Sequence, residues 1–430
     1  MGHIIIKLDF TCTDDSAACL NPLLEVRKGI NEIRDVQNIV DIIADPDGKG
    51  RSDHWTDTAN DLLVSVILHI LYVEPDKSLT GVRNFMSNIN LTEEQLFQYM
   101  LTTIHDPDGI CGWVDPQTQK PTRTHPIVAA GARDMLNRSE AERTGIISTL
   151  KRFLKLYRDP IIAKNTRTSD FKWGDLLDPT KRMSIYINMP PPDKSRLRPL
   201  IRLIINQMLG RLTETWVPPD EQDANAAPTL LVMDEFPQLG HLQFFEDALA
   251  YTAGYGLRTL LVSQDLSQLY SAYGQHQSIT SSCDVLTVYA PNKLETAQYL
   301  SKMLGTKTVT KEQTNYSGHT TNTTLNHINI SEQDYKRELL TPDELMRLPF
   351  DESLTFKTNH KTIHGKKVMY WHDPVFNERS KIPPPLVSDK LSVAHDWNYV
   401  QKNASEISEI ESMHNEKNDK NNTDNDFDLL

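Results

Sequence analysis

The stretch Leu230-Leu231-Val232-Met233-Asp234-Glu235 places two carboxylates directly after four apolar residues. Such a run predicts a buried strand, and open α/β sheets bind ligands at the carboxyl ends of their strands. In nucleotide-hydrolysing proteins a Walker B strand ends in this way. The first acid, here Asp234, holds Mg²⁺, often through water, and the second, here Glu235, activates the attacking water. A strand that merely ends in two solvated acids is the structural alternative.

A second polar strand end follows one helix later. The strand predicted over 259–263 ends at Ser263-Gln264, and parallel neighbours end at the same edge of a sheet. We therefore expect Gln264 to lie beside Asp234 and Glu235, where its amide could contact a γ-phosphate and orient water. The alternative role of Gln264 is a polar cap on a strand end.

Strands and helices alternate through the second half of the chain. Apolar patterning predicts strands over 183–189, 229–233, 259–263 and 285–289, and helices over 194–212, 243–252 and 293–304. This order predicts an α/β fold with a mostly parallel sheet covered on both faces. A further strand is predicted over 4–8, a long polar loop over 306–330, a helix over 341–349 and a strand over 366–371.

The region between these strands has helical periodicity. Helices are predicted over 53–73, 92–104 and 139–157, and we interpret the region as an all-α insertion. The predicted domains are the start of the α/β domain (1–50), the all-α insertion (51–170), the rest of the α/β domain (171–376) and a disordered acidic tail (377–430).

Composition limits the functional classes. The chain has 430 residues and a net charge of -13, which excludes a protein whose whole surface binds polyanions. Its four cysteines show no zinc-site spacing. No signal peptide is evident, and the longest apolar run, Leu62 to Val73, is too short to span a bilayer. These features predict that this chain alone is soluble and cytoplasmic.

Two clusters of basic residues are candidates for nucleic-acid contact. Lys151, Arg152, Lys155 and Arg158 fall near one face of the helix that starts at Ser139. The second cluster, at the start of the helix predicted over 194–212, contains Lys194, Arg196, Arg198 and Arg202. Either cluster could contact phosphates inside a ring pore. A solvated face of an amphipathic helix is the alternative interpretation of both.

Several longer segments carry a family resemblance. These segments are 234–240 (DEFPQLG), 253–258 (AGYGLR), 263–269 (SQDLSQL), Asn21-Pro22-Leu23, 53–72 and 339–345 (LLTPDEL). In this order they resemble the TraG-type coupling proteins of conjugative type IV secretion, over roughly residues 20–376.

The resemblance implies a RecA-like, homo-hexameric ATPase that uses ATP and Mg²⁺ and is anchored at the cytoplasmic face of the bacterial inner membrane. Such a protein brings single-stranded DNA with its relaxase, or protein substrates, to the secretion channel. In these terms Glu235 and Gln264 are catalytic, Asp234 binds Mg²⁺ through water, and Arg258 contacts nucleotide or a neighbouring subunit. An arginine that simply pairs with an acid is the alternative for Arg258.

The sequence departs from the family in one respect. It contains no GxxxxGK[ST] segment, the loop whose amides and lysine bind the β- and γ-phosphates. The nearest candidate, residues 47–52, is better interpreted as a turn. The chain therefore resembles the carboxyl-terminal portion of a coupling protein, without its P-loop and membrane anchor, and we expect little ATP hydrolysis from it alone.

Three functional hypotheses follow. In the first, the chain is the cytoplasmic portion of a conjugative coupling ATPase that recruits relaxosome substrates and drives DNA transfer once a P-loop is supplied. In the second, it is a non-catalytic module that docks relaxosome or effector proteins. In the third, it is a degenerate remnant without activity. Whether the chain is itself an enzyme is left open by its sequence.

Overall fold

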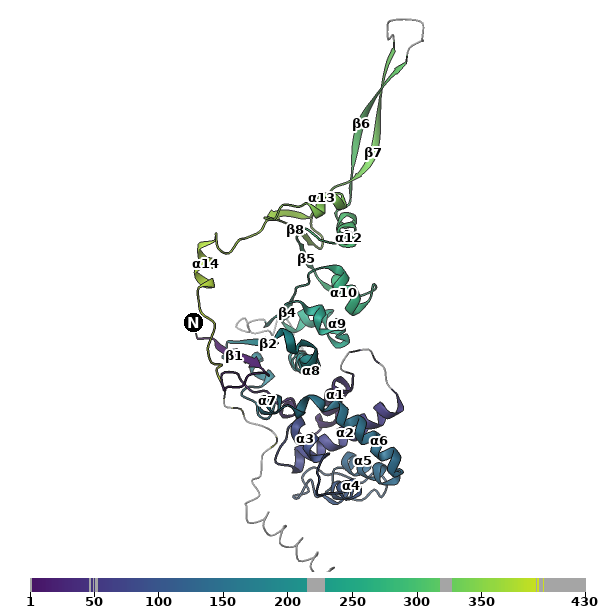
Figure 1. Ribbon diagram of the computed structural model, residues 1–430, viewed down its shortest axis with the longest axis vertical. Coiled ribbons are helices and arrows are strands. Elements are labelled where there is room, and N and C mark those ends of the chain that lie inside the picture. Colours follow the sequence, from purple (N-terminus) through teal and green to yellow (C-terminus); the bar gives the residue numbers. More distant parts are fainter. Residues whose placement is uncertain are drawn as a thin grey trace, which may run out of the picture.

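The computed structural model describes residues 2–45, 48, 50, 53–214, 229–317, 327–391, 393 and 397. The molecule is elongated, with a helical part at one end, strands and helices in the middle, and a long two-stranded hairpin at the other end (Figure 1). The candidate acids lie in the middle part, after strand β3.

The helical part confirms the prediction of a region built from helices. Asp53 caps α2, because its carboxylate accepts a hydrogen bond from the backbone N–H of Thr56 at 2.7 Å. The predicted helix over 139–157 divides into α6 and a 3-10 turn, Lys155–Arg158. The helices of this part are α2 (His54–Val73), α3 (Leu79–Phe85), α4 (Glu93–Thr102), α5 (Pro126–Asn137), α6 (Glu140–Phe153) and α7 (Pro160–Asn165).

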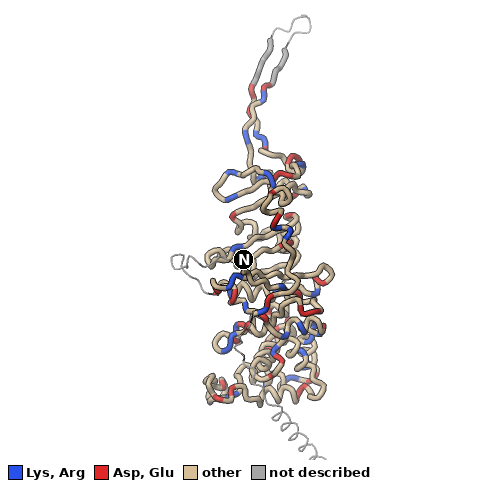
Figure 2. Tube along the Cα trace, turned by 90° about the vertical axis from the view of Figure 1, so that its left-hand side faces the viewer, with Lys and Arg blue, Asp and Glu red and all other residues tan. Residues whose placement is uncertain are grey.

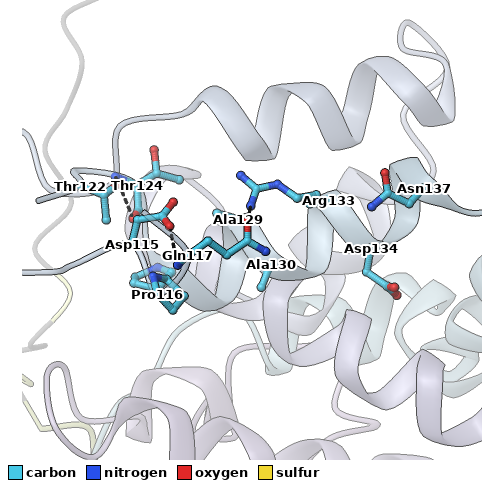
Figure 3. Close-up of a pocket in the computed structure, with 11 residues that line it drawn as sticks. Asp115, Pro116, Gln117, Thr122, Thr124, Ala129, Ala130, Arg133, Asp134 and Asn137 are labelled. Atoms are coloured by element: carbon cyan, nitrogen blue, oxygen red, sulfur yellow. Dashed lines mark hydrogen bonds between the residues drawn. The ribbon is translucent and has the colours of Figure 1, made fainter. Parts of the chain in front are cut away.

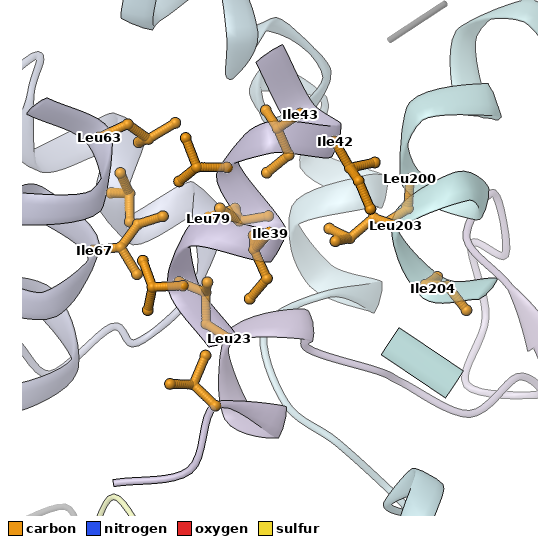
Figure 4. Close-up of a cluster of buried hydrophobic side chains, with 14 of the residues drawn as sticks. Leu23, Ile39, Ile42, Ile43, Leu63, Ile67, Leu79, Leu200, Leu203 and Ile204 are labelled. Carbon is orange, nitrogen blue, oxygen red and sulfur yellow. The ribbon is translucent and has the colours of Figure 1, made fainter. Parts of the chain in front are cut away.

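Helix α1 (Glu32–Ala44) joins the helical part to the rest of the protein. It lies between α2 and α8 (Lys194–Leu212), as Figure 4 shows, and Ile39, Ile42 and Ile43 on it are buried. Residues from all three helices belong to one continuous hydrophobic core. The domain boundary near residue 50 therefore crosses a shared core, and the division into domains stays a prediction.

Four of the expected strands form parallel pairs. Strand β1 (Ile4–Asp9) pairs with β2 (Met183–Asn188), and β3 (Thr229–Met233) pairs with β4 (Leu257–Leu261). The connection from β3 to β4 includes the short helix α9 (Gln243–Leu249), and α10 (Leu266–Tyr273) follows β4. Parallel pairing places the carboxyl ends of β3 and β4 side by side, as the sequence pattern predicts.

The expectation that helices cover both faces of the sheet is wrong for β3 and β4. Leu231, Met233 and Leu261 contribute to the core, whereas alternate residues point the other way and are exposed. Within the described residues no element covers this second face. Its apolar side chains are Leu230 (61% exposed), Val232 (55%), Leu260 (52%) and Val262 (41%), which we call the open face.

Three further corrections concern the strands after β4. The segment predicted as a long polar loop contains an antiparallel hairpin of β6 (Thr306–Ser317) and β7 (His327–Glu338). Strand β5 (Val285–Val288) does not extend the parallel sheet, because it pairs antiparallel with β8 (Glu352–Lys357). The last strand is β9 (Ile363–Lys366), so most of the strand predicted over 366–371 is absent. The helices of this region are α11 (Ile279–Ser282), α12 (Leu294–Leu304) and α13 (Pro342–Met346).

The predicted disordered tail is ordered in its first part. Helix α14 (Pro374–Ser380) is followed by a segment that runs along β1, where Asp389 accepts a hydrogen bond from the N–H of Ile5 at 2.7 Å. Trp397 is buried and donates to the carbonyl of Val26 at 2.8 Å. The contacts of Ser388 and Asp389 satisfy backbone N–H groups of Lys7 and Ile5 at the free edge of β1. Residues 398–430 lie outside the described residues, so the prediction of disorder stays untested there.

Candidate functional site

Glu235 occupies an unusual backbone conformation at the carboxyl end of β3. Its φ of 48° and ψ of 39° lie in the left-handed region, which disfavours residues other than glycine, asparagine and aspartate. The next residue, Phe236, starts a 3-10 turn (Phe236–Leu239) and is buried in the core. The chain therefore reverses sharply at Glu235 and holds its carboxylate at the end of the strand. Strained residues of this kind gather at functional sites.

The Glu235 carboxylate is held by three side chains from three elements. Gln264, just after β4, donates to its Oε1 at 2.8 Å. Gln238 in the 3-10 turn donates to its Oε2, and Lys194 Nζ at the start of α8 lies 3.7 Å from the same oxygen. Lys194 also donates to Gln238 at 2.7 Å. The carboxylate is therefore oriented before any ligand arrives.

The predicted juxtaposition of Glu235 and Gln264 is thus present. Gln264 is itself oriented, because its side-chain oxygen accepts from Gln268 Nε2 at 3.2 Å. Asp265 caps α10 and accepts from Gln268 N at 3.0 Å. Burial alone would raise the pKa of Asp265, but hydrogen bonds from Ser267 and Lys293 hold that pKa below its ordinary value. A charged Asp265 fixes the start of the helix that positions Gln264.

Asp234 differs from its neighbour. It is exposed and, within the described residues, makes no hydrogen bond or ion pair. A single free carboxylate suits Mg²⁺ that keeps most of its waters and takes the remaining ligands from phosphates. No group of three or more His, Cys, Asp and Glu side chains in the described part of the chain could hold a metal by itself. The residues therefore fit the magnesium half of a nucleotide site, whereas no glycine-rich loop provides the phosphate half.

Arg258 is not brought together with these residues. It lies at the amino end of β4, opposite Leu230 in the register and on the open face. It lies six positions before Gln264 in the chain, which corresponds to roughly 20 Å of strand. Within one copy of the chain Arg258 is therefore not placed beside Glu235 and Gln264, and its contact with nucleotide or with a neighbouring subunit stays a prediction.

The basic residues predicted to bind DNA lie elsewhere on the molecule. Lys151 and Arg152 are in the last turn of α6, and Lys155 and Arg158 are in the following 3-10 turn. All four are exposed, and none has an ion pair within the described residues. In the second cluster, Lys194 contacts Glu235, and Arg196 pairs with Asp159 and Asp193. The contacts of Lys194, Gln238 and Gln268 were not predicted from the sequence.

The hollow shown in Figure 3 is separate from these acids. It lies in the helical part and is lined by polar side chains that include Asp115, Gln117 and Arg133. Arg133 donates to Gln117 at 2.8 Å, so the charged group is already engaged within the wall. The described helices also contain none that is both long and apolar enough to cross a membrane.

Comparison with known proteins identifies the family. The family model of type IV secretory system conjugative DNA transfer matches residues 1–394. The chain belongs to this family. The resemblance to TraG-type coupling proteins is thereby confirmed.

Curated relatives of the conjugative DNA-transfer family support this assignment. Two conjugal transfer proteins TraG of Escherichia coli are 39% and 38% identical to the chain over 403 and 401 residues. Each alignment covers 87% of this chain and 60% of the relative. Protein VirD4 of Rhizobium radiobacter is 26% identical over 375 residues, which cover 80% of this chain and 53% of VirD4. The chain therefore spans about 60% of the length of the TraG relatives.

Solved structures show that the fold is shared with the plasmid coupling protein TrwB. An unbound form of TrwB gives a TM-score of 0.59 at 18% identity and covers 85% of this chain and 73% of TrwB. The complex of TrwB with ADP and Mg²⁺ gives 0.56 at 16% identity, with coverage of 86% and 76%. This likeness establishes a TrwB-like α/β fold for the chain.

Proposed function

We propose that this chain is the cytoplasmic part of a conjugative coupling ATPase, and that Asp234, Glu235 and Gln264 form the hydrolytic half of its nucleotide site. The observation that carries the proposal is the oriented Glu235 carboxylate, held by Gln264 and Gln238 at the carboxyl end of a parallel strand pair. Its support is membership of a conjugative DNA-transfer family and a fold like that of TrwB, a protein solved with ADP and Mg²⁺.

The chemistry follows from these positions. Asp234 would hold Mg²⁺ through water, and the ion would neutralise charge on the phosphates. Glu235 accepts the hydrogen bond of a water in line with the γ-phosphate, and Gln264 orients that water. Since Gln238 and Lys194 hold the carboxylate of Glu235 in one orientation, less reorganisation is needed when the nucleotide binds.

The phosphate-binding half must come from a loop that this sequence does not contain. We propose that a polypeptide segment with a GxxxxGK[ST] loop covers the open face of β3 and β4. Exposed apolar surface of this kind marks a site that another segment can cover. Leu230, Val232 and Leu260 are all more than half exposed there. Without that segment, we expect little or no ATP hydrolysis from the chain.

Assembly and cargo complete the proposal. The full-length protein would form a homo-hexamer at the cytoplasmic face of the bacterial inner membrane and contact components of the type IV secretion channel. Single-stranded DNA with its relaxase, or other relaxosome proteins, would be the cargo. Lys151, Arg152, Lys155 and Arg158 are exposed cations without ion pairs in the described structure and could contact DNA phosphates.

The test is reconstitution of hydrolysis. The chain is co-expressed with an amino-terminal fragment of a related TraG protein that carries the GxxxxGK[ST] loop, and DNA-stimulated ATPase activity is measured. We expect activity only from the pair. Glu235→Gln should lower it by about a hundredfold or more, because the general base is lost. The matched control is Glu295→Gln, an exposed acid in the first turn of α12. Equal rates for the Glu235→Gln pair and the unmodified pair would refute the role of Glu235.

The second candidate function is a non-catalytic docking module for relaxosome or effector proteins. It is favoured by the absence of the phosphate-binding loop from the sequence. This candidate predicts that the chain retains relaxosome components in a pull-down, while the co-expressed pair shows no ATPase activity. Restored hydrolysis that depends on Glu235 would exclude it as the sole function.

A further inference from the structure

The hairpin of β6 and β7 extends far from the rest of the protein. Each strand has twelve residues, which corresponds to roughly 40 Å of ribbon. Figure 1 shows it projecting beyond α12 and α13. Isolated two-stranded hairpins are only marginally stable in water. A two-stranded ribbon of this length is therefore expected to contact another surface.

The register separates the charges of the hairpin onto its two faces. Residues directly opposite one another share a face, and successive residues along a strand alternate between faces. One face, which we call the basic face, carries Lys307, Lys311 and Arg337 and no acid. The other, the acidic face, carries Glu312, Glu332, Asp334 and Glu338 with the single base Lys336. Figure 2 shows these charges in the half of the hairpin near the body.

Two cross-strand pairs on these faces have like charges. Lys307 is directly opposite Arg337, and Glu312 is directly opposite Glu332. Like charges in this position destabilise a hairpin, whereas swapping one member of each pair would remove the repulsion. Arg337 is partly compensated by Glu344 in α13 at 2.6 Å, but Glu312 and Glu332 are exposed and form no ion pair within the described residues. Like-charged pairs that destabilise the hairpin are unexpected in a structural element, and they therefore point to a function for these charges.

We propose that the basic face of one hairpin binds the acidic face of the hairpin of a second copy of this chain. Contact between identical faces is disfavoured, because it would place base against base or acid against acid. The pairing is therefore head to tail, the arrangement that generates a ring when its rotation closes. This inference rests on the homo-oligomer of the proposed function and adds the surface through which neighbouring copies recognise each other.

The charges favour a second copy over a nucleic acid as the partner. The hairpin carries as many acidic as basic side chains, so a polyanion attracted by the basic face is repelled by the acidic face. A second copy satisfies both faces at once. The basic face also has an apolar centre, where half-buried Val309 lies opposite Tyr335. At this level the acidic face has Thr308 and Thr310, which lie opposite Lys336 and Asp334.

The experiment uses two charge variants of the full chain. Lys307→Glu/Lys311→Glu makes the basic face acidic, and Glu312→Lys/Glu338→Lys makes the acidic face basic. Lys307→Glu and Glu312→Lys also replace the like-charged pairs by opposite ones, so the hairpin should become more stable rather than unfold. The matched control is Lys357→Glu/Lys361→Glu, two exposed lysines outside the hairpin. Association is measured by sedimentation velocity at low ionic strength without nucleotide.

We expect the unmodified chain and the control to associate, and each charge variant alone to associate roughly tenfold or more weakly. An equimolar mixture of the two variants should recover association, because a basic face again meets an acidic face. Glu235→Gln should associate like the unmodified chain, which separates this inference from the nucleotide chemistry.

Several results would overturn the inference. They are an unmodified chain that remains monomeric at its highest soluble concentration, variants that associate normally, and a mixture no stronger than its components. A fourth is a Lys307→Glu/Lys311→Glu variant that loses binding to a labelled oligonucleotide while its sedimentation is unchanged. That result would assign the basic face to nucleic acid instead.

Discussion

His105→Gln should make the free energy of unfolding of this protein less sensitive to a fall in pH. His105 is buried between α2 and α5, with Nε2 3.0 Å from His69 Nδ1. Its Nδ1 accepts a hydrogen bond from the backbone N–H of His125 at 3.3 Å. That acceptor would be lost if His105 were protonated on both nitrogens. Burial, with the neighbouring His69 and His125, lowers the pKa of His105 to about 3.

The magnitude follows from this shift. An unfolded histidine titrates near 6.5. Because the folded pKa of His105 is lower, the unfolded chain binds the proton more tightly. The stability linked to His105 is therefore fully present above about pH 6.5 and is lost as the pH falls toward 3. At about pH 5 the loss amounts to about 2 kcal/mol.

Glu25 acts in the opposite direction over part of the same range. Burial raises the pKa of this carboxyl to about 7. The folded state then binds the proton more tightly, so this contribution increases as the pH falls from about 7 toward 4.5. The pH dependence of the unmodified protein therefore contains two opposed contributions. A comparison between variants at each pH isolates that of His105.

The assay is urea unfolding followed by circular dichroism at about pH 7.5 and about pH 5. The free energy of unfolding of the unmodified protein, minus that of His105→Gln, should fall by about 2 kcal/mol between the two pH values. His276→Gln, a substitution at an exposed histidine, serves as the control and should show no such change. A difference between the unmodified protein and His105→Gln that is equal at both pH values would refute the buried neutral histidine.

Three further predictions concern backbone, packing and charge. Glu235→Gly should stabilise the fold by up to about 1 kcal/mol, because glycine adopts the left-handed conformation of Glu235 freely. The same substitution should abolish reconstituted hydrolysis. Urea unfolding checks the first effect and the ATPase assay checks the second. Gly131→Ala should destabilise the helical part by about 1–3 kcal/mol, since its methyl group would clash with Ser65 Oγ and lie 2.7 Å from Ser65 Cβ. Thermal unfolding measures this loss. Lys151→Glu/Arg152→Glu should weaken binding of a labelled single-stranded oligonucleotide and flatten its salt dependence by about 1.4 in slope; an unchanged slope would exclude these residues from the interface.

The sequence predicted the central feature of the candidate site. Two polar strand ends separated by one helix imply adjacency in a parallel pair, and Gln264 does donate to Glu235 at 2.8 Å. The prediction succeeds because it depends only on apolar runs and on the geometry of parallel strands. The long helix α2 was predictable for a similar reason, since Asp53 is an N-cap residue followed by a helical apolar pattern.

Other features depend on contacts that a local pattern does not encode. The contact of Lys194 with Glu235 joins elements 41 positions apart in the chain, and a lysine at a helix start equally fits a solvated face. The hairpin was missed because Thr, Asn and Ser between residues 306 and 330 resemble a loop composition, although threonine also favours strands. The packing of Ser388 and Asp389 on β1 follows from free backbone groups at the strand edge, not from an apolar pattern.

Under the proposed function, the open face would link the stability of the strand pair to the completion of the nucleotide site. Leu230 and Val232 are on the same strand as Asp234, and their side chains alternate with those that fill the core. Covering Leu230, Val232 and Leu260 would bury roughly half of each side chain, which contributes on the order of 3 kcal/mol before the entropic cost of association. A segment that brings the phosphate-binding loop would therefore also gain binding energy from the strand that ends at Asp234, the proposed magnesium ligand. Under this proposal, a polar substitution such as Val232→Thr should weaken reconstitution without touching any catalytic group.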